Sequence, residues 1–304
     1  MKRLGLVLGG ALLLASCQHA AAQRLLAEAC PPPGYDSASL STLRANHFAI
    51  PDDARRNAFA LDIAACLSSP DPALRDGVGF EAMQHLLRER QLNVETMRTL
   101  EGRLRAHLFV EDSRGFTRPF AALVLSELAR ADRIDAYLSG AERAALLDAA
   151  VAYLQSVRDY RGYDEREGWR HGVAHGADLL MQLALNPALG RTDIERIMSA
   201  VESQIAPIGH FYVYGESERL ARPILMIARR DVFTESEWTA WLARIAAPAP
   251  LNDWSEAFSS QRGLAQRHNT AAFFQTLYAN ARVTAEPAYA PLLPGLETGL
   301  RTLP

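Results

Sequence analysis

The chain has 304 residues and a formal net charge of −3, with 32 basic and 35 acidic side chains. Lys2 is its only lysine, so a chain lacking the first residues has none, which excludes mechanisms built on a Schiff-base or P-loop lysine. Without the positive charges of Lys2 and Arg3, the formal net charge of −3 becomes −5. A chain this acidic lacks the excess of positive charge that is typical of nucleic-acid-binding proteins. No G-x-S-x-G, H-E-x-x-H, G-x-G-x-x-G or paired C-x-x-C motif indicates a common hydrolase, zinc protease, dinucleotide site or zinc ribbon.

The N-terminus has the organisation of an export signal. Two basic residues precede an apolar run over 4–14, which is too short to span a bilayer comfortably. The run closes on Leu14-Ala15-Ser16-Cys17, which resembles the cleavage box of bacterial lipoproteins. We therefore predict a lipoprotein signal peptide over 1–16, a lipidated Cys17 and a tether over 17–34.

The destination of the exported chain follows from the residues after that box. Gln18 stands where an aspartate would retain a lipoprotein in the inner membrane, so the expected location is the outer membrane, facing the periplasm. A second small-residue cut at Ala20-Ala21-Ala22 would instead release a soluble periplasmic protein. In the first case the lipid is the only membrane attachment.

Two cysteines remain after lipidation, and an even count in an oxidising compartment is typical of a disulfide. A bridge between Cys30 and Cys66 would join the proline-rich segment 31–33 to a predicted helix. The alternative is that Cys66 is a small buried residue on an apolar helix face.

Beyond the signal, the apolar pattern predicts helix after helix, and hence an all-α fold over residues 35–304. Strand-like alternation is confined to the short segment Phe211–Tyr214. Short connections rich in Pro, Gly and Asp predict stacked antiparallel pairs, a HEAT-like α-solenoid, with an α/α toroid as the alternative. Helical spacing is clear in three sets, Phe59/Ile63/Cys66/Leu67, Met97/Leu100/Leu104/Leu108 and Leu146/Ala150/Tyr153/Val157. Capping boxes predict three helix starts, at Ser139 with Glu142, Thr192 with Glu195, and Thr234 with Glu237.

The stretch Gly168–Leu180 carries the main functional signal. If it is one helix, His171, His175 and Asp178 fall within an arc of about 60° on one face. Trp169 falls on the opposite, apolar face. An amphipathic helix explains the apolar face but not the choice of two histidines and an aspartate.

Three interpretations of this polar face stay open. The histidines, four residues apart, could share a Zn²⁺ ion with Asp178 as a third ligand or as an orienting acceptor. A site without metal could instead use a histidine–carboxylate pair for acid/base chemistry. The two histidines could also have only a packing role, and the neighbouring Gly172 and Gly176 favour a close approach of another helix.

Several segments together resemble one bacterial family, catalogued as domain of unknown function 2785. The most specific is the R-G-Y…G-W-x-H-x-x-A-H-G-A-D block between Arg161 and Asp178. The resemblance covers most of the mature chain, and implies an all-helical fold and no established activity. The other segments that carry it are Ser69–Asp76, Phe116–Asp132, Tyr214–Ile224 and Arg267–Tyr278.

Two functions from different classes follow. The favoured one is a lipid-anchored binding or scaffold module of the cell envelope, whose groove takes a peptide, a glycan or a partner protein. The alternative is an envelope hydrolase, metal-assisted or acid/base, using His171, His175 and Asp178. The predicted ligand-contacting residues in either case are Arg161, Asp164, Trp169, Glu216 and Arg219. No role is assigned to His47, His85, His107 and His210, while Arg262, Arg267 and His268 are interpreted as helix-surface or capping residues.

Overall fold

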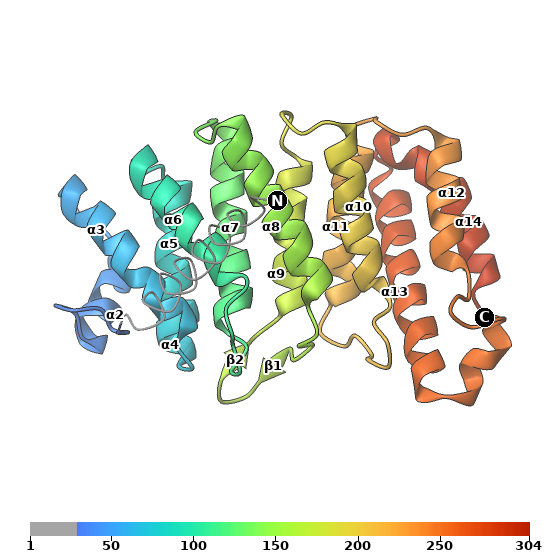
Figure 1. The fold of residues 1–304 in the computed structure, drawn as a ribbon, viewed down its shortest axis with the longest axis horizontal. Coiled ribbons are helices and arrows are strands. Elements are labelled where there is room, and N and C mark those ends of the chain that lie inside the picture. The colour runs from blue at the N-terminus through green and yellow to red at the C-terminus, as the bar shows by residue number, and fades with distance from the viewer. Residues whose placement is uncertain (1–28) are drawn as a thin grey trace, which may run out of the picture. The chain divides into compact units, whose positions relative to one another are not determined.

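The computed structural model describes residues 29–304 and is all-α, as predicted (Figure 1). The two strands among these residues, β1 (Tyr163–Asp164) and β2 (Gly168–Trp169), pair in a small hairpin. The export signal and Cys17 lie outside the described residues. The chain divides into two compact units, each described by itself below. Unit 1 extends to Leu128 and includes residues 165–168, and unit 2 contains Ala129–Asp164 and Trp169–Pro304.

Unit 1 is a set of short helices followed by the first part of a longer one. Residues 72–88 form one continuous helical run, in which a π-helical segment lies between two α-helical ones. The boundary with unit 2 falls inside α7, after Leu128. The elements are α2 (Ser37–Ala45), α3 (Asp53–Ile63), η1 (Ala64–Ser68), α4 (Pro72–Leu74), η2 (Arg75–Phe80), α5 (Glu81–Arg88), α6 (Val94–His107) and α7 (Thr117–Ile134).

A fully buried arginine organises the centre of unit 1. The guanidinium carbon of Arg75 lies 4.2 Å from the ring centre of Phe116 and 4.8 Å from that of Phe120. Its two terminal nitrogens donate to the backbone oxygens of Ser69 at 3.0 Å and Glu167 at 2.7 Å. A buried guanidinium needs such partners, because leaving it unpaired costs several kcal/mol (on the order of 3–5). These contacts give a structural reason for three of the segments that carry the family resemblance.

Cys30 and Cys66 are joined by a disulfide, with their Cα atoms 5.0 Å apart. Cys66 lies in η1 and is fully buried. The bridge therefore ties the start of the described chain to the core of unit 1.

Unit 2 contains the remaining helices, stacked so that each packs on its near neighbours in the chain. Helix α8 contacts α9 and α10, α9 contacts α11, α11 contacts α13, and α12 contacts α14. This is the packing of helix pairs predicted for a HEAT-like array. The elements after the hairpin are α9 (Gly172–Ala184), α10 (Arg191–Ile205), α11 (Glu216–Ala228), α12 (Glu235–Ala246), η3 (Trp254–Ser259), α13 (Gln261–Thr284), η4 (Pro287–Leu292) and α14 (Leu293–Thr302), and α8 (Gly140–Ser156) precedes it. None of the helices within residues 29–304 is both long and apolar enough to cross a membrane.

The capping boxes locate two helix starts correctly and one wrongly. Ser139 and Thr234 cap α8 and α12 as predicted. Helix α10 begins at Arg191, not after Thr192, because extended Gly190 is its N-cap and the Asp193 carboxylate accepts the Gly190 amide at 3.1 Å. The expected partner Glu195 instead binds Arg191 at 2.9 Å.

Helix α9 is the most buried helix of unit 2, since every residue from Gly172 to Leu180 is buried. A Cβ on Gly176 would lie 3.0 Å from a Leu154 methyl and 3.1 Å from the Tyr153 ring. The Tyr153 hydroxyl donates to the Gly172 carbonyl at 3.3 Å. The glycines thus allow α8 and α9 to approach closely, as the packing interpretation predicts.

Candidate functional site

The helix that carries the predicted polar face begins later than expected. Helix α9 starts at Gly172, so Trp169 lies in β2 and His171 is the N-cap residue rather than part of the helix. The prediction of one helix from Gly168 is therefore wrong. The Arg170 amide donates to the Gly162 carbonyl at 2.9 Å, which continues the hairpin pairing up to the helix. Two residues, Arg170 and His171, separate β2 from α9, and His171 takes the left-handed conformation, with φ 58°.

His171 is held on both sides. Its ring stacks on Trp169, with centroids 4.5 Å apart, and its Nε2 donates to the Tyr214 carbonyl oxygen at 3.0 Å. Since a carbonyl only accepts, Nε2 carries a proton in the neutral ring. Burial lowers the pKa of His171, the hydrogen bond to Tyr214 opposes this, and the charge of Arg219 lowers the pKa further. A left-handed histidine is a strained residue, and such strain is concentrated at functional sites.

We name five residues the polar seam: His171 at the N-cap of α9, His175 and Asp178 within α9, and Glu216 and Arg219 of α11. The packing of these two helices brings them together. The His171 and His175 rings meet edge to face, 5.9 Å apart. Arg219 donates through Nε to Asp178 Oδ1 at 2.9 Å, and its Nη2 binds Oδ2. The seam therefore joins two of the predicted polar regions.

The seam is largely buried, and Asp178 and Arg219 form an ion pair within it. His171, His175, Asp178 and Glu216 are each at most 9% exposed. Burial lowers the pKa of Arg219 to about 10, so it stays charged beside Asp178 at neutral pH. Burial raises the pKa of Glu216, whose Oε2 accepts the Tyr214 amide at 2.9 Å. Among residues 29–304, no group of three or more His, Cys, Asp or Glu side chains is placed to hold a metal ion.

Next to the seam, three aromatic side chains form an exposed cluster. Trp169 contacts Tyr163, with centroids 5.1 Å apart, and meets the edge of Tyr214 at 5.9 Å. The exposed fractions are 49% for Tyr163 and 38% for both Trp169 and Tyr214. A Cβ on Gly162 would lie 2.0 Å from the Tyr214 ring, so only glycine lets this ring lie against the hairpin.

This cluster borders a hollow of about 590 Å³ in unit 2, which we name the tyrosine hollow. Of the predicted residues, Arg161 and Asp164 line it, whereas the seam residues do not. Arg161 is fixed by Asp159, whose carboxylate accepts from its Nη2 at 2.6 Å. The full lining is Arg158, Asp159, Tyr160, Arg161, Gly162, Tyr163, Asp164, Arg170, His210, Val213 and Tyr214.

The far wall of the tyrosine hollow was missed from the sequence. It is the loop 206–215 between α10 and α11, which includes the segment predicted as strand-like but is irregular. His210, to which no role was assigned, stacks on Tyr160 with centroids 4.8 Å apart. Asn269 of α13 is fully buried, accepts the Tyr212 amide at 2.9 Å and donates to the His210 carbonyl at 2.8 Å. In the sequence, the sign that Asn269 holds this loop is its place as a polar residue on a largely apolar helix face.

The fold and the site define an α-helical array with an internally paired polar seam beside an open hollow rich in arginine and tyrosine. The family model described as "Protein of unknown function (DUF2785)" matches residues 104–279, more than half of the 304 residues. The chain belongs to this family. The comparisons of this chain with the curated proteins and with the solved structures found no match. The matched range includes the whole of the hollow and the seam.

Proposed function

We propose that this protein is a binding module of the cell envelope that holds a peptide or glycan ligand in the tyrosine hollow. One observation carries the proposal. The hollow presents exposed tyrosines and arginines to solvent, whereas His171, His175 and Asp178 beside it are buried and engaged by their neighbours. Aromatic and arginine side chains are enriched where proteins bind partners, because they combine large contact area with hydrogen-bonding groups.

The walls of the hollow are preorganised, which limits the entropy lost on binding. Asp159 fixes Arg161, Gly162 lets Tyr214 pack on the hairpin, and Asn269 anchors the loop 206–215. In this proposal the seam supports the hollow rather than acting on the ligand. His171 contributes by fixing the Tyr214 carbonyl, and the Asp178–Arg219 pair holds α9 to α11.

The envelope location rests on the N-terminal sequence alone. The apolar run and Leu14–Cys17 favour a lipid-anchored protein of the outer membrane, and a cut after Ala22 would give a soluble periplasmic form. In either form the hollow would face periplasmic peptides and glycans.

The alternative function is an envelope hydrolase that uses His171, His175 and Asp178, with or without Zn²⁺. For this activity Asp178 would have to act while it is paired with Arg219, or the ion pair would have to open. Metal analysis separates the two functions. Stoichiometric zinc that disappears in the His171→Ala/His175→Ala variant would favour the hydrolase.

The binding function is tested with two defined ligand panels, peptidoglycan-derived glycan fragments and short synthetic peptides, titrated against purified protein by calorimetry. Tyr163→Ala removes an exposed ring of the hollow, and we expect it to weaken binding of any ligand found by about tenfold. Phe109→Ala is the matched control, since Phe109 is 50% exposed and does not line the hollow. Equal loss in both variants, or no binding from either panel, would disprove the proposal.

A further inference from the structure

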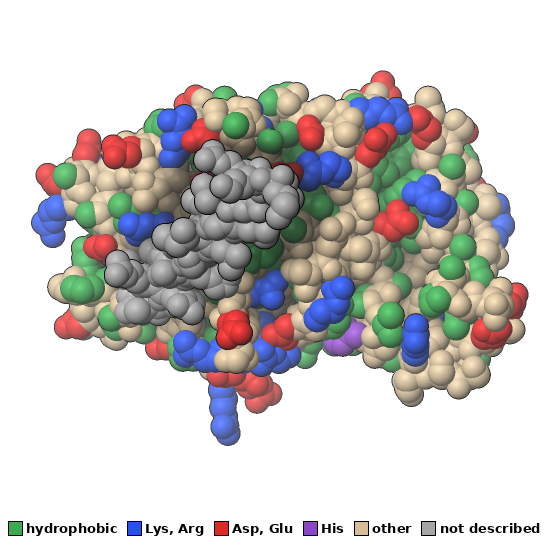
Figure 2. All heavy atoms as spheres, viewed as in Figure 1, with side chains coloured by type: hydrophobic (Ala, Val, Ile, Leu, Met, Phe, Trp, Pro, Cys, Tyr) green, Lys and Arg blue, Asp and Glu red, His purple; other side chains and the backbone are tan. Residues whose placement is uncertain are grey.

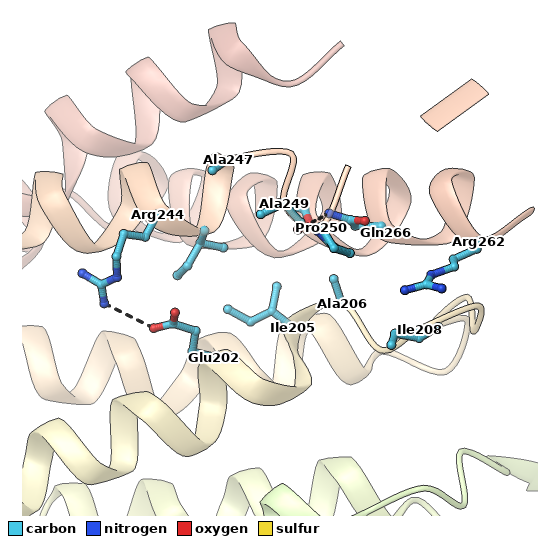
Figure 3. Close-up of a pocket in the computed structure, with 12 residues that line it drawn as sticks. Glu202, Ile205, Ala206, Ile208, Arg244, Ala247, Ala249, Pro250, Arg262 and Gln266 are labelled. Carbon is cyan, nitrogen blue, oxygen red and sulfur yellow. Dashed lines mark hydrogen bonds and ion pairs between the residues drawn. The ribbon is translucent and has the colours of Figure 1, made fainter. Parts of the chain in front are cut away.

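A second hollow, of about 200 Å³, lies among α10, α12 and α13 in unit 2 (Figure 3). We name it the isoleucine hollow, after Ile205 and Ile208 in its wall. Arg244 with its partner Glu202 stands at one end and Arg262 at the other, and the aliphatic side chains lie between them (Figure 3). Gln266 donates to the carbonyls of Pro248 and Ala249 at 2.9 and 2.7 Å, which fixes the opposite wall.

The loop 206–215 is a shared wall of the two hollows. Ile208 lines the isoleucine hollow, and His210, two residues further on, lines the tyrosine hollow. Residues two apart are separated by at most about 7 Å along the chain, so one short extended ligand can enter both. The crest of the loop is apolar and open to solvent, with Ile208 72% and Val213 68% exposed.

Each hollow contains an arginine without a carboxylate partner among residues 29–304. Arg158 donates to the backbone oxygens of Gln155 and Val157, at 2.9 and 2.6 Å, and both acceptors are neutral. Arg262 forms no ion pair or hydrogen bond with any described residue. Over α10 to α14, the face drawn in Figure 2 carries both basic and acidic side chains. Each hollow thus offers at least one guanidinium group that a ligand carboxylate can pair with.

The lining favours one chemical class of ligand. Aliphatic crest residues such as Ile208 and Val213 suit apolar side chains better than sugars, which stack on aromatic rings. The unmatched guanidinium groups of Arg158 and Arg262 suit carboxylates, with which arginine forms paired hydrogen bonds. A peptide that alternates acidic and apolar residues has both features.

We propose that one extended acidic peptide segment binds across both hollows, crossing the loop 206–215 between them. Its apolar side chains contact Ile208 and Val213, and its carboxylates bind Arg158 on one side and Arg262 on the other. This inference rests on the proposed binding function and adds to it the class of ligand and a second subsite. The isoleucine hollow contributes affinity only for a ligand long enough to pass the loop.

The test compares three synthetic peptides by calorimetry with the purified protein: a Glu-Leu alternating octapeptide, its tetrapeptide counterpart and a Gln-Leu octapeptide. The extended octapeptide spans about 26 Å and the tetrapeptide about 13 Å. We expect the Glu-Leu octapeptide to bind about tenfold more tightly than either of the others, and its affinity to fall as salt rises. Arg262→Gln should weaken the octapeptide about fivefold and leave the tetrapeptide unchanged, whereas Arg158→Gln should weaken both.

Arg55→Gln is the matched control, because Arg55 is an exposed arginine of α3 outside both hollows. Equal affinities of the two octapeptides, or of the octapeptide and tetrapeptide, would overturn the inference. So would an octapeptide affinity that Arg262→Gln leaves unchanged. In each of these cases the proposed function survives if a peptide or glycan still binds and Tyr163→Ala weakens it. Absence of binding by all three peptides overturns the inference, and the glycan panel then decides the proposed function.

Discussion

Arg219 donates a hydrogen bond through Nε to Asp178 Oδ1 at 2.9 Å, and so ties the carboxylate of α9 to a guanidinium of α11. The pair is only slightly exposed, with 12% of the Asp178 side chain and 24% of the Arg219 side chain accessible. A carboxylate paired in this way contributes to the packing of the two helices. The relationship also offers a direct test of the role of the polar face.

Asp178→Asn should destabilise the protein by about 2–4 kcal/mol, because it leaves Arg219 largely buried without a counter-charge. Urea denaturation measures the change. Glu218→Gln is the control, since Glu218 pairs with Arg222 on the exposed surface of α11, the helix that carries Arg219. We expect this variant to lose about 0.5 kcal/mol of stability or less. If Asp178→Asn instead kept full stability while ligand binding was lost, Asp178 would belong to a binding or catalytic site.

Gly162→Ala should displace the Tyr214 ring, because the new methyl group would lie 2.0 Å from it. We expect an altered near-ultraviolet circular dichroism spectrum and about tenfold weaker ligand binding in the tyrosine hollow. Gly140→Ala is the control, since a Cβ there meets no atom within 4 Å. An unchanged spectrum and affinity in Gly162→Ala would show that the position of Tyr214 does not shape the hollow.

Reduction of the Cys30–Cys66 disulfide should lower the free energy of unfolding by about 3–4 kcal/mol, through the larger entropy of the unfolded chain. The helices should remain folded without the bridge, because a chain this long buries enough apolar surface to be stable without a covalent cross-link. Urea midpoints with and without reductant measure the effect. The Cys30→Ser/Cys66→Ser variant should not respond to reductant, and two free thiols in unreduced, denatured protein would argue against the bridge.

Asp132 should make the protein sensitive to acid. Burial raises its pKa, but hydrogen bonds from Arg143 and from the amides of Leu138 and Tyr137 outweigh this, so its pKa in the folded state lies below the ordinary 3.8. Its stabilising contribution is present above about pH 4 and is lost as the pH falls through the lowered folded-state pKa.

We expect Asp132→Asn to lower stability at pH 7 by about 2–3 kcal/mol and to reduce the loss of stability as the pH falls below about 4. Urea titrations at a series of pH values give both quantities. Asp148→Asn, at an exposed ion pair with Arg196, should change neither by much. An equal acid response in wild type and Asp132→Asn would assign the sensitivity to other groups.

Cys17→Ser should abolish lipid incorporation and release the protein from the membrane fraction, because the thiol is the expected acceptor of the lipid. Labelled fatty acid in growing cells and fractionation measure the two effects. Ser16→Ala, which keeps a small residue before the cysteine, is the control and should stay lipidated. Soluble, unlipidated wild-type protein would instead favour the cut after Ala22.

The sequence alone determined the helices and many of their boundaries, because these signals are local. Apolar residues such as Leu100 and Leu104 recur within one turn, and the caps Ser139 and Thr234 act on residues three positions away. Such features depend on few neighbours, so periodicity and capping rules recover them. The resemblance to the family likewise depended only on the order of residues in the sequence, and the family match confirmed it over residues 104–279.

Only the tertiary structure decided how these residues meet. The pairing of the hairpin moved the start of α9 to Gly172 and made His171 a cap, although the helical pattern of the sequence continues through it. His171 meets the Tyr214 carbonyl across 43 residues, and Asn269 meets Tyr212 across 57. Such contacts form only when whole helices pack. The packing that results is a compromise between burying apolar surface and pairing polar groups over the entire unit. No local pattern encodes that compromise. The residues of the seam were named from the sequence, but their contacts and both hollows became visible only in the tertiary structure.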